Sequence, residues 1–159
     1  MSHALTLPLP PKPTREQIER LEAELLALET HGLGVELPTW HHFADGLAAR
    51  TIFIAAGTCL TGAAHKAEHL NIAAGDITVW TEAGMKRLTG YNVLPSFAGA
   101  KRVGLAHADT WWTTVHANPD NCQDVEILED RLLEGAEMLQ TRRIASGQLV
   151  CGARPLEIV

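Results

Sequence analysis

Two histidines lie four residues apart in the stretch GAAHKAEHLNIAAGD, which covers residues 62–76. At this spacing His65 and His69 lie on one side of a helix, and also on one face of a strand, where residues an even number apart point the same way. Imidazole nitrogen is a common ligand of zinc, iron and nickel. The pair could therefore form part of a metal site or merely share a face, and the spacing allows both.

Further candidate ligands are His107 and His116, and His116 ends the sequence WWTTVH. In a strand it shares its parity with Trp112 and Thr114, so these three side chains line one face. If that face points inward, His65 and His69 could meet His116 from neighbouring strands. Three neutral imidazoles plus water would suit one divalent transition metal (zinc, iron, nickel or manganese). The alternative is that all three are hydrogen-bonded wall residues, because eight histidines in 159 residues make chance neighbours common.

The patterns of several common catalytic classes are absent from the sequence. HKAEH reverses the order of the metalloprotease motif HExxH, and the chain contains no GxSxG, no phosphate-binding P-loop and no GxGxxG that opens a helix. The adjacent histidines His41 and His42 face opposite sides of a strand, so at most one of them can point inward. Cys59 is expected to be a packed core thiol. These observations leave the histidine cluster as the main candidate for chemistry.

The N-terminal region predicts an extended arm followed by a helix. Prolines at positions 8, 10, 11 and 13 favour an arm over residues 1–13. Thr14 with Gln17 three residues later is a capping-box pattern and Gly32 is a C-terminal stop, which predicts a helix over residues 14–32. Its apolar stripe would pack on the protein's own domain or against the same helix of a second copy. The stripe consists of Ile18, Leu21, Leu25 and Leu28.

Residues 35–117 contain short β-branched and aromatic segments separated by turn residues, which is typical of an all-β sandwich or barrel. Helical periodicity returns over residues 120–145, where Gly135 is expected to bend or divide the helix, and residues 146–159 form a tail. The predicted fold class is therefore all-β-dominated, with a single barrel between an N-terminal helix and C-terminal helices. Turns are expected at Gly75-Asp76, Glu82-Ala83-Gly84, Gly90, Pro95, Gly99 and Ala108-Asp109.

The composition limits the classes of partner. A formal net charge of −6 argues against general affinity for nucleic acid or for an anionic membrane, so neither is expected as a partner. No apolar run approaches the ~20 residues that a membrane helix needs. The first residues lack the features of a secretory signal, and the three widely spaced cysteines suit reduced thiols better than disulfides. We therefore expect a protein of the cytoplasm.

One block of the sequence resembles the first cupin motif, in which a glycine is followed by a His-x-His pair, a glutamate and a second glycine. Gly57 opens this block, His65 stands for the second histidine, His69 falls near the glutamate and Gly75 closes it. Ala63 occupies the place of the first histidine, and the glutamate is missing. Of the family's four metal ligands, only His65 carries over residue by residue.

A second block, GYNVLPSFAGAKR, resembles the second cupin motif, Gly-x5-Pro-x-Gly-x2-His-x3-Asn. It provides Gly90, Pro95 and Gly99, and Arg102 occupies the place of the histidine. The resemblance covers about residues 40–117 and implies a cupin-type jelly roll. Because a guanidinium matches a carboxylate or phosphate, Arg102 could convert a metal site into an anion site. Otherwise Arg102, like Lys101 before it, is a surface charge on an edge strand.

Aromatic side chains could complete such a ligand site. Tyr91 and Trp112 at the mouth of a barrel would stack on a flat molecule, or Trp112 would fill the core. Because Trp111 and Trp112 face opposite ways, one of them lies outside, where it is exposed or covered by a helix or a second subunit. The predicted ligand-binding residues are therefore Arg102, Tyr91 and Trp112, and the predicted ligand is small and anionic.

More narrowly, the sequence is similar to short cupin-like proteins of tailed bacteriophages, which implies a viral origin and a place in the bacterial host cytoplasm or in the virion. Three functions stay open. The first is the binding of a small ligand or metal ion in the barrel. The second is a virion-associated assembly or interaction module with a degenerate barrel site, and the third is a metal-dependent cupin enzyme. A homodimer through the barrel edge or the helices is expected, as in most cupins.

Overall fold

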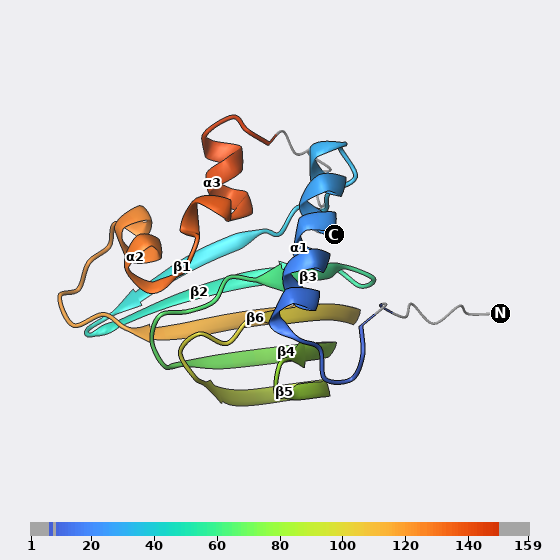
Figure 1. Cartoon of the computed structure of the whole chain (residues 1–159). Coiled ribbons are helices and arrows are strands. Elements are labelled where there is room, and N and C mark those ends of the chain that lie inside the picture. Colours follow the sequence, from blue (N-terminus) through green and yellow to red (C-terminus); the bar gives the residue numbers. More distant parts are fainter. Residues whose placement is uncertain (1–6, 8, 150–159) are drawn as a thin grey trace, which may run out of the picture.

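The computed structural model describes residue 7 and residues 9–149. It shows one antiparallel sheet, with one helix before the strands in the chain and short helices after them (Figure 1). The strands are β1 (Thr39–Ala44), β2 (Leu47–Ile54), β3 (Cys59–Gly62), β4 (His69–Thr81), β5 (Gly84–Ser96) and β6 (Arg102–Ala117). The helices are α1 (Arg15–Thr30), α2 (Val125–Leu132), the short 3₁₀ helix η1 (Ala136–Met138) and α3 (Gln140–Ala145). The predicted arm over residues 1–13 and the predicted tail over residues 146–159 lie largely outside the described residues.

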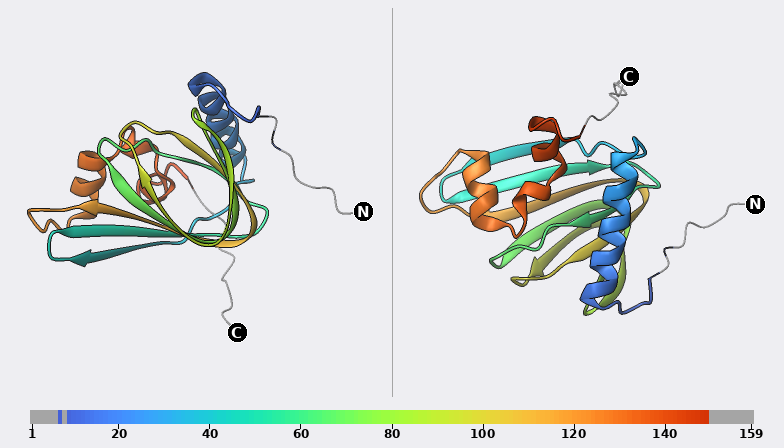
Figure 2. Two further views of the ribbon diagram at one scale, coloured as in Figure 1. Left: turned by 90° about the horizontal axis from the view of Figure 1, so that it is seen from below. Right: turned by 45° about the horizontal axis from the view of Figure 1, so that its top comes forward.

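The sheet curls into an open barrel. Its strand order is β1-β2-β6-β4-β5, and β3 also pairs with β6. β1 and β5 stand at the two edges of this order, and Figure 2 shows α2 and α3 on the open, concave side while α1 lies outside, on the convex side. The predicted fold class is confirmed: strands dominate the chain, a single sheet forms its body, and helices precede and follow it.

Several predicted turns lie inside strands instead. Gly75-Asp76, Gly90, Pro95 and Ala108-Asp109 fall within β4, β5 and β6, so these strands are longer than the sequence suggests. At Gly75-Asp76 and Ala108-Asp109 the reason is a β-bulge, because the pairing of β4 with β6 shifts register between Ala74 and Asp76. A bulge bends a strand and increases its twist without ending it. The predicted turn around Glu82-Ala83 is confirmed, with Thr81 and Gly84 paired across it.

Gly75 shows why this bend needs glycine. Its φ is +150°, and a Cβ at this position would lie 2.4 Å from Thr110 Oγ1 and 2.6 Å from the Asp109 carbonyl oxygen. Thr110 Oγ1 also accepts a hydrogen bond from the Asp76 amide at 3.1 Å. β4 and β6 therefore approach each other closely where the sheet bends, and the bend gives the sheet the curvature that surrounds a cavity.

Two apolar clusters lie on opposite faces of the sheet. The concave cluster includes Ile52, Ile54, Ala73, Ile77, Val79, Leu88 and Ala106. On the convex face, Ile18 and Leu21 of α1 pack with Trp80, Val103 and Leu105. α1 begins with the predicted capping box, in which Thr14 and Gln17 exchange hydrogen bonds. The helix therefore packs on its own sheet through the first half of its apolar stripe, while Leu28 is 47% exposed.

Gly135 divides the C-terminal helical segment, as predicted. It adopts φ +65°, ψ +40°, between α2 and η1, and this left-handed conformation suits glycine. α2 itself begins at the cap residue Asp124, whose side chain accepts a hydrogen bond from the Ile127 amide. The break therefore separates α2 from the short helices η1 and α3.

Lys101 is not a surface charge, contrary to one of the two alternatives raised by the sequence. Its ammonium group lies 2.6 Å from Glu22 Oε1 on α1, and its side chain is 10% exposed. The same carboxylate oxygen accepts a hydrogen bond from the Thr61 hydroxyl. Lys101 therefore joins α1 to the sheet on the convex side, where its charge has a partner.

Beyond the area that α1 covers, the convex face carries an exposed aromatic group. Trp111 contacts both Trp40 and Phe53, with ring centroids 5.3 and 5.0 Å apart. Trp112 lines the concave side, so the two tryptophans face opposite ways as predicted. Strand parity and register show which side chains point outward on this face. No Asp, Glu, Lys or Arg stands at the outward positions of β1, of β2, of the first half of β4, or of the second halves of β5 and β6. We call this area the uncharged convex face.

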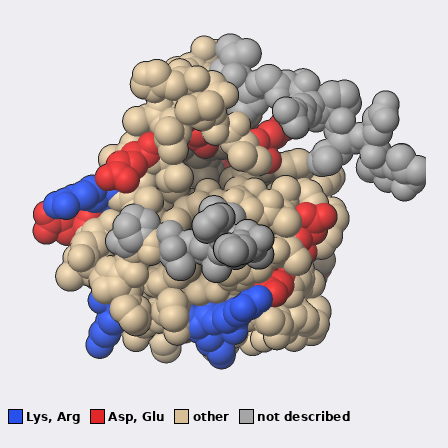
Figure 3. Space-filling model, turned by 90° about the vertical axis from the view of Figure 1, so that its right-hand side faces the viewer, with Lys and Arg blue, Asp and Glu red and all other residues tan. Residues whose placement is uncertain are grey.

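On the side of the molecule shown in Figure 3, the Lys and Arg side chains of the described residues lie in separate groups at the left and along the bottom, and the Asp and Glu side chains lie mostly above those at the bottom. Among the described residues, no helix is long and apolar enough to cross a membrane.

Candidate metal centre

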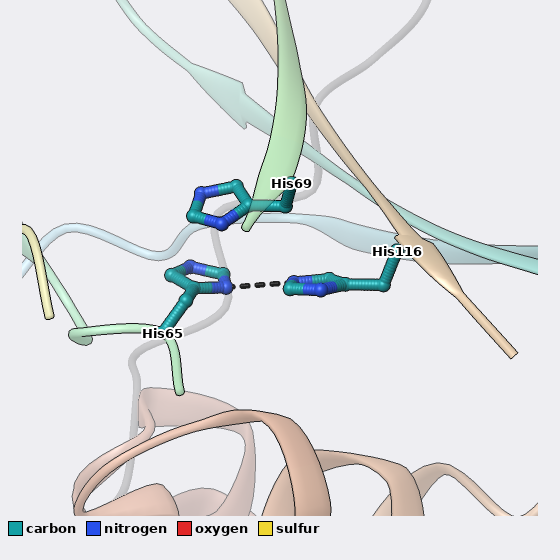
Figure 4. A group of neighbouring side chains, drawn as sticks. All are labelled: His65, His69 and His116. Atoms are coloured by element: carbon teal, nitrogen blue, oxygen red, sulfur yellow. Dashed lines mark hydrogen bonds between the residues drawn. The ribbon is translucent and has the colours of Figure 1, made fainter. Parts of the chain in front are cut away.

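His65, His69 and His116 meet at one end of the concave face (Figure 4). His69 is the first residue of β4 and His116 is the second-last residue of β6. His65 lies in the loop between β3 and β4, where a backbone bridge to Leu133 ties this loop to the segment after α2. One imidazole nitrogen of each residue lies within 4.8 Å of the others. The structure thus brings together the three histidines that the sequence singles out, although His65 comes from a loop and not from a strand.

The three rings interact directly with one another. His65 Nδ1 and His116 Nε2 are 2.7 Å apart and share a hydrogen bond, in which one neutral ring donates to the other. The rings of His65 and His69 stack with centroids 4.1 Å apart, and His116 lies 4.9 Å from each of them. The three rings therefore contact one another directly, and no carboxylate or cationic side chain of the described residues lies between them.

Two nitrogens of this cluster have no hydrogen-bond partner among the described residues. His69 Nδ1 lies 3.0 Å from the Ala67 carbonyl oxygen, so it carries the proton and leaves the lone pair on Nε2. That Nε2 atom and His116 Nδ1 are both buried without a hydrogen-bond partner. A backbone carbonyl that fixes the tautomer of a histidine is a common support for metal ligation. The residues present therefore suit a metal that accepts imidazole nitrogen, such as zinc, iron(II) or nickel.

Burial keeps the cluster neutral. Desolvation, followed by the neighbouring His69 and His116, lowers the pKa of His65 to about 3. Desolvation and the nearby His69 lower the pKa of His116 to about 4. The pKa of His69 is also lowered, mainly by burial. Neutral imidazole is the form that binds metal, so the site needs no proton release near neutral pH.

The metal-free protein is expected to lose stability as the pH falls below about 6.5. The unfolded histidines take up protons near pH 6.5, whereas folded His65 and His116 do so only near pH 3 and 4, so stability is complete above pH 6.5 and declines below it. Two such groups lower the free energy of unfolding by about 2–3 kcal/mol between pH 7.5 and 5.5. Urea denaturation of chelator-treated protein measures this, and a flat profile would contradict it. His116→Gln should make the profile shallower.

A cavity of ≈ 140 Å³ adjoins the cluster and is enclosed by the concave face, with α2 and the segment after it on the open side. His65 and His116 belong to its wall. Most of the wall is apolar, including Ile52, Ile54 and Leu60. An apolar cavity with few polar groups is the usual form of a small-molecule site.

The structure separates the three predicted ligand-binding residues. Arg102 lines the cavity, where it donates a hydrogen bond to the Ser96 hydroxyl, and burial lowers its pKa. Trp112 also lines the cavity, and its Nε1 donates to Asn71 Oδ1 at 3.1 Å. Tyr91 lies on the convex side of β5 with 72% of its surface exposed, so its placement does not support the predicted role.

Sequence reasoning missed three polar residues of the cavity: Arg50, Asn71 and Glu129. Arg50 follows Ala48 and precedes Ile52 at intervals of two in β2, so strand parity could have placed it on the inner face. Asn71 follows His69 by two residues in β4 and could have been found in the same way. Glu129 comes from α2, and no local pattern places that helix over the sheet. His41 lines the cavity while His42 is exposed, as the parity argument allows.

No family model and no curated protein matches the chain. Solved structures do resemble it. A cupin superfamily protein from Desulfitobacterium hafniense is 12% identical, with a TM-score of 0.44 over 52% of this chain and 77% of that chain. The protein KdgF from Halomonas sp. is 12% identical, with a TM-score of 0.45 over 55% of this chain and 81% of that chain. Salicylate 1,2-dioxygenase from Pseudoaminobacter salicylatoxidans is 16% identical, with a TM-score of 0.48, and the match covers 77% of this chain and 36% of the dioxygenase.

At 12–16% identity these likenesses concern the fold alone. The structures that resemble this chain include cupin superfamily proteins. The similarity to bacteriophage proteins stays a prediction. The open antiparallel barrel with N- and C-terminal helices is consistent with a cupin-type jelly roll.

Proposed function

We propose that this protein binds one divalent transition metal through His65, His69 and His116, and that the metal serves the binding of a small molecule in the adjoining cavity. The observation that carries the proposal is the convergence of three imidazole nitrogens within 4.8 Å, two of the rings having a buried nitrogen without a partner. Three protein ligands leave a coordination position for water or a ligand, as in many catalytic metal sites.

The residues around the ligands have defined tasks in this proposal. The Ala67 carbonyl fixes the tautomer of His69 and leaves the lone pair on Nε2. The bridge between His65 and Leu133 holds the loop that carries His65. The apolar wall of the cavity excludes water from whatever binds beside the metal, which strengthens the polar contacts made there. When bound, the metal supplies a Lewis acid at the mouth of the cavity.

Zinc is expected to stabilise the chelator-treated protein saturably, with one equivalent sufficient when the protein concentration far exceeds the dissociation constant. A metal bound only by the native state shifts unfolding by RT ln(1 + [L]/Kd), which is about 4 kcal/mol at a free concentration 1,000 times Kd. Thermal denaturation and calorimetric titration with Zn²⁺, Ni²⁺ and Fe²⁺ measure the stoichiometry and the preference. A failure of all three ions to bind would refute the proposal.

A second candidate function, an interaction module, is favoured by the uncharged convex face. We propose that a second copy of this chain covers it. This face spans five strands and carries no charged side chain, so a partner that fits it should also present an uncharged surface. The same face of a second copy is such a surface. Exposed Trp111 and Trp40, 47% and 43% exposed, are the kind of side chain that anchors interfaces.

Trp111→Glu is expected to convert a dimer of this protein into monomers, because it places a charge at the centre of the apolar contact. Sedimentation velocity over a range of concentrations measures the change, and circular dichroism checks that the fold is kept. Leu33→Glu is the control, since Leu33 is 68% exposed just after α1 and lies in no strand of the uncharged convex face. A wild-type protein that is monomeric throughout would contradict this second proposal.

A further inference from the structure

Arg50 is a cation inside the barrel without an anion to pair with. It lies on β2, where it is paired in register with His41 of β1 and Thr114 of β6, and its side chain lines the cavity. Its Nε atom is buried and has no hydrogen-bond partner. Among the described residues, none forms an ion pair with Arg50. Burial of the guanidinium also lowers its pKa.

The nearest candidate to neutralise Arg50 is already engaged. Glu129 is 7% exposed, and its Oε2 accepts a hydrogen bond from Arg142 Nε at 2.9 Å. Its Oε1 atom lies 3.9 Å from His41 Nε2 and has no hydrogen-bond partner. The carboxylate attracts Arg50 through space but does not bind it. A buried charge that lacks a partner costs several kcal/mol, and proteins keep such groups mainly where a ligand completes them.

Further donors face the same space. Asn71 Oδ1 accepts hydrogen bonds from Trp112 Nε1 at 3.1 Å and from Thr114 Oγ1 at 3.0 Å, which fixes the orientation of the amide. Its Nδ2 atom is buried and unpaired. Arg50, Thr114 and Asn71 are register neighbours on β2, β6 and β4, so the guanidinium and the amide flank one row of the concave face. This row therefore offers an excess of donors.

The rest of the cavity determines what kind of anion fits. The wall around Arg50 is formed mainly by hydrocarbon and aromatic side chains, among them Ile52, Ile54, Val79 and Trp112. A strongly hydrated ion such as inorganic phosphate would lose its water against these side chains without enough new hydrogen bonds. A molecule with one charged end and an apolar body satisfies both parts of the cavity.

We propose that the cavity binds a small organic monocarboxylate, with its carboxylate on the Arg50 guanidinium and its hydrocarbon or aromatic body against Ile52 and Trp112. A guanidinium presents two parallel N–H donors to a carboxylate, which gives both strength and orientation. The Asn71 amide donates a further hydrogen bond to the ligand. This inference deepens the proposed function by naming the class of small molecule, yet the contacts that carry it do not include the metal ligands.

The test uses benzoate and hexanoate as anions and benzamide as the uncharged match of benzoate. Calorimetric titration of the chelator-treated full chain is expected to show saturable binding of at least one of the two carboxylates at one site, with benzamide about tenfold or more weaker. Arg50→Met is expected to weaken carboxylate binding by about 10- to 100-fold, and to raise the melting temperature of the unliganded protein because it removes an unpaired buried charge. Arg87→Met, which removes an exposed arginine on the outer face of β5, is the control and should bind as the wild type does.

The outcomes are distinguishable from those of the metal proposal. His65→Ala is expected to lose zinc binding and keep carboxylate binding in the chelator-treated state, whereas Arg50→Met is expected to keep zinc binding. Equal binding of benzoate by Arg50→Met and wild type would overturn the inference, and so would a wild-type protein that binds neither carboxylate with or without zinc. Carboxylate binding without zinc binding would support this inference and refute the metal proposal alone.

Discussion

Glu129→Ala is expected to lower the free energy of unfolding by about 3 kcal/mol, because breaking a buried ion pair leaves its partner's charge uncompensated. Glu129 is 7% exposed, and its Oε2 pairs with Arg142 Nε at 2.9 Å. It is also the carboxylate of α2 that faces Arg50 and His41. Its removal would leave these two groups and Arg142 around one end of the cavity. Urea denaturation at pH 7.5 measures the loss.

Glu126→Ala provides the matched control. Glu126 lies one turn earlier on α2, and its Oε1 is 3.9 Å from Nη1 of the same arginine, Arg142, but its side chain is 78% exposed. Exposed ion pairs contribute about 0–1 kcal/mol, so this variant should be close to the wild type. Equal effects of the two substitutions would show that burial of Glu129 has no part in its contribution. Adding Arg50→Met to Glu129→Ala should recover part of the loss, since it removes one of the unpaired charges.

His116→Ala is expected to abolish the stabilisation by zinc, which amounts to about 4 kcal/mol in the wild type at a free zinc concentration 1,000 times Kd. The variant loses one of three ligands, and two imidazoles seldom hold zinc tightly without further protein ligands. It also loses the hydrogen bond between His65 Nδ1 and His116 Nε2. Thermal denaturation with and without zinc separates the two effects, because the lost hydrogen bond lowers the metal-free value whereas the lost ligand removes the difference that zinc makes.

His42→Ala is the control for this experiment. His42 is exposed, whereas its neighbour His41 lines the cavity. Surface histidines bind zinc weakly, and His42→Ala shows how much of the zinc-dependent shift in melting temperature comes from such binding. A zinc-dependent shift that survives in His116→Ala and disappears in His42→Ala would contradict the site proposed here.

Strand periodicity accounts for what the sequence could predict of the site. Because side chains alternate strictly in a strand, Trp112 and His116 had to share a face, and both line the cavity. The same rule separates Trp111 from Trp112 and His41 from His42. The N-terminal helix was equally predictable, because its capping box depends only on Thr14 and Gln17, which are close in sequence.

The features that the sequence could not predict depend on distant contacts. Glycine and aspartate at Gly75-Asp76 are as common in turns as in bulges, and only the close approach of Thr110 on β6 makes this position a bulge within a long strand. Lys101 has its partner, Glu22, 79 residues away on α1. Tyr91 suited a ligand site by residue type, but its register opposite Ala74 puts it on the convex face.

The role of Arg50 was hidden for a related reason. A charged residue within an otherwise apolar strand is consistent with a surface position, a buried ion pair or a ligand site. These differ only in what lies opposite, and here that is Thr114, Asn71 and a helix that arrives about 80 residues later. The sequence places Arg50 on a face, and the fold determines that this face is closed over by α2 and lacks a carboxylate to pair with Arg50.

The metal content of untagged protein, measured by elemental mass spectrometry after purification without chelators, tests the central claim most directly. We expect close to one equivalent of zinc, iron or nickel in the wild type and in His42→Ala, and a loss of that metal in His65→Ala and His116→Ala. Metal-free wild-type protein that also takes up none of these ions on reconstitution would contradict it, and so would an equal metal content in all four proteins.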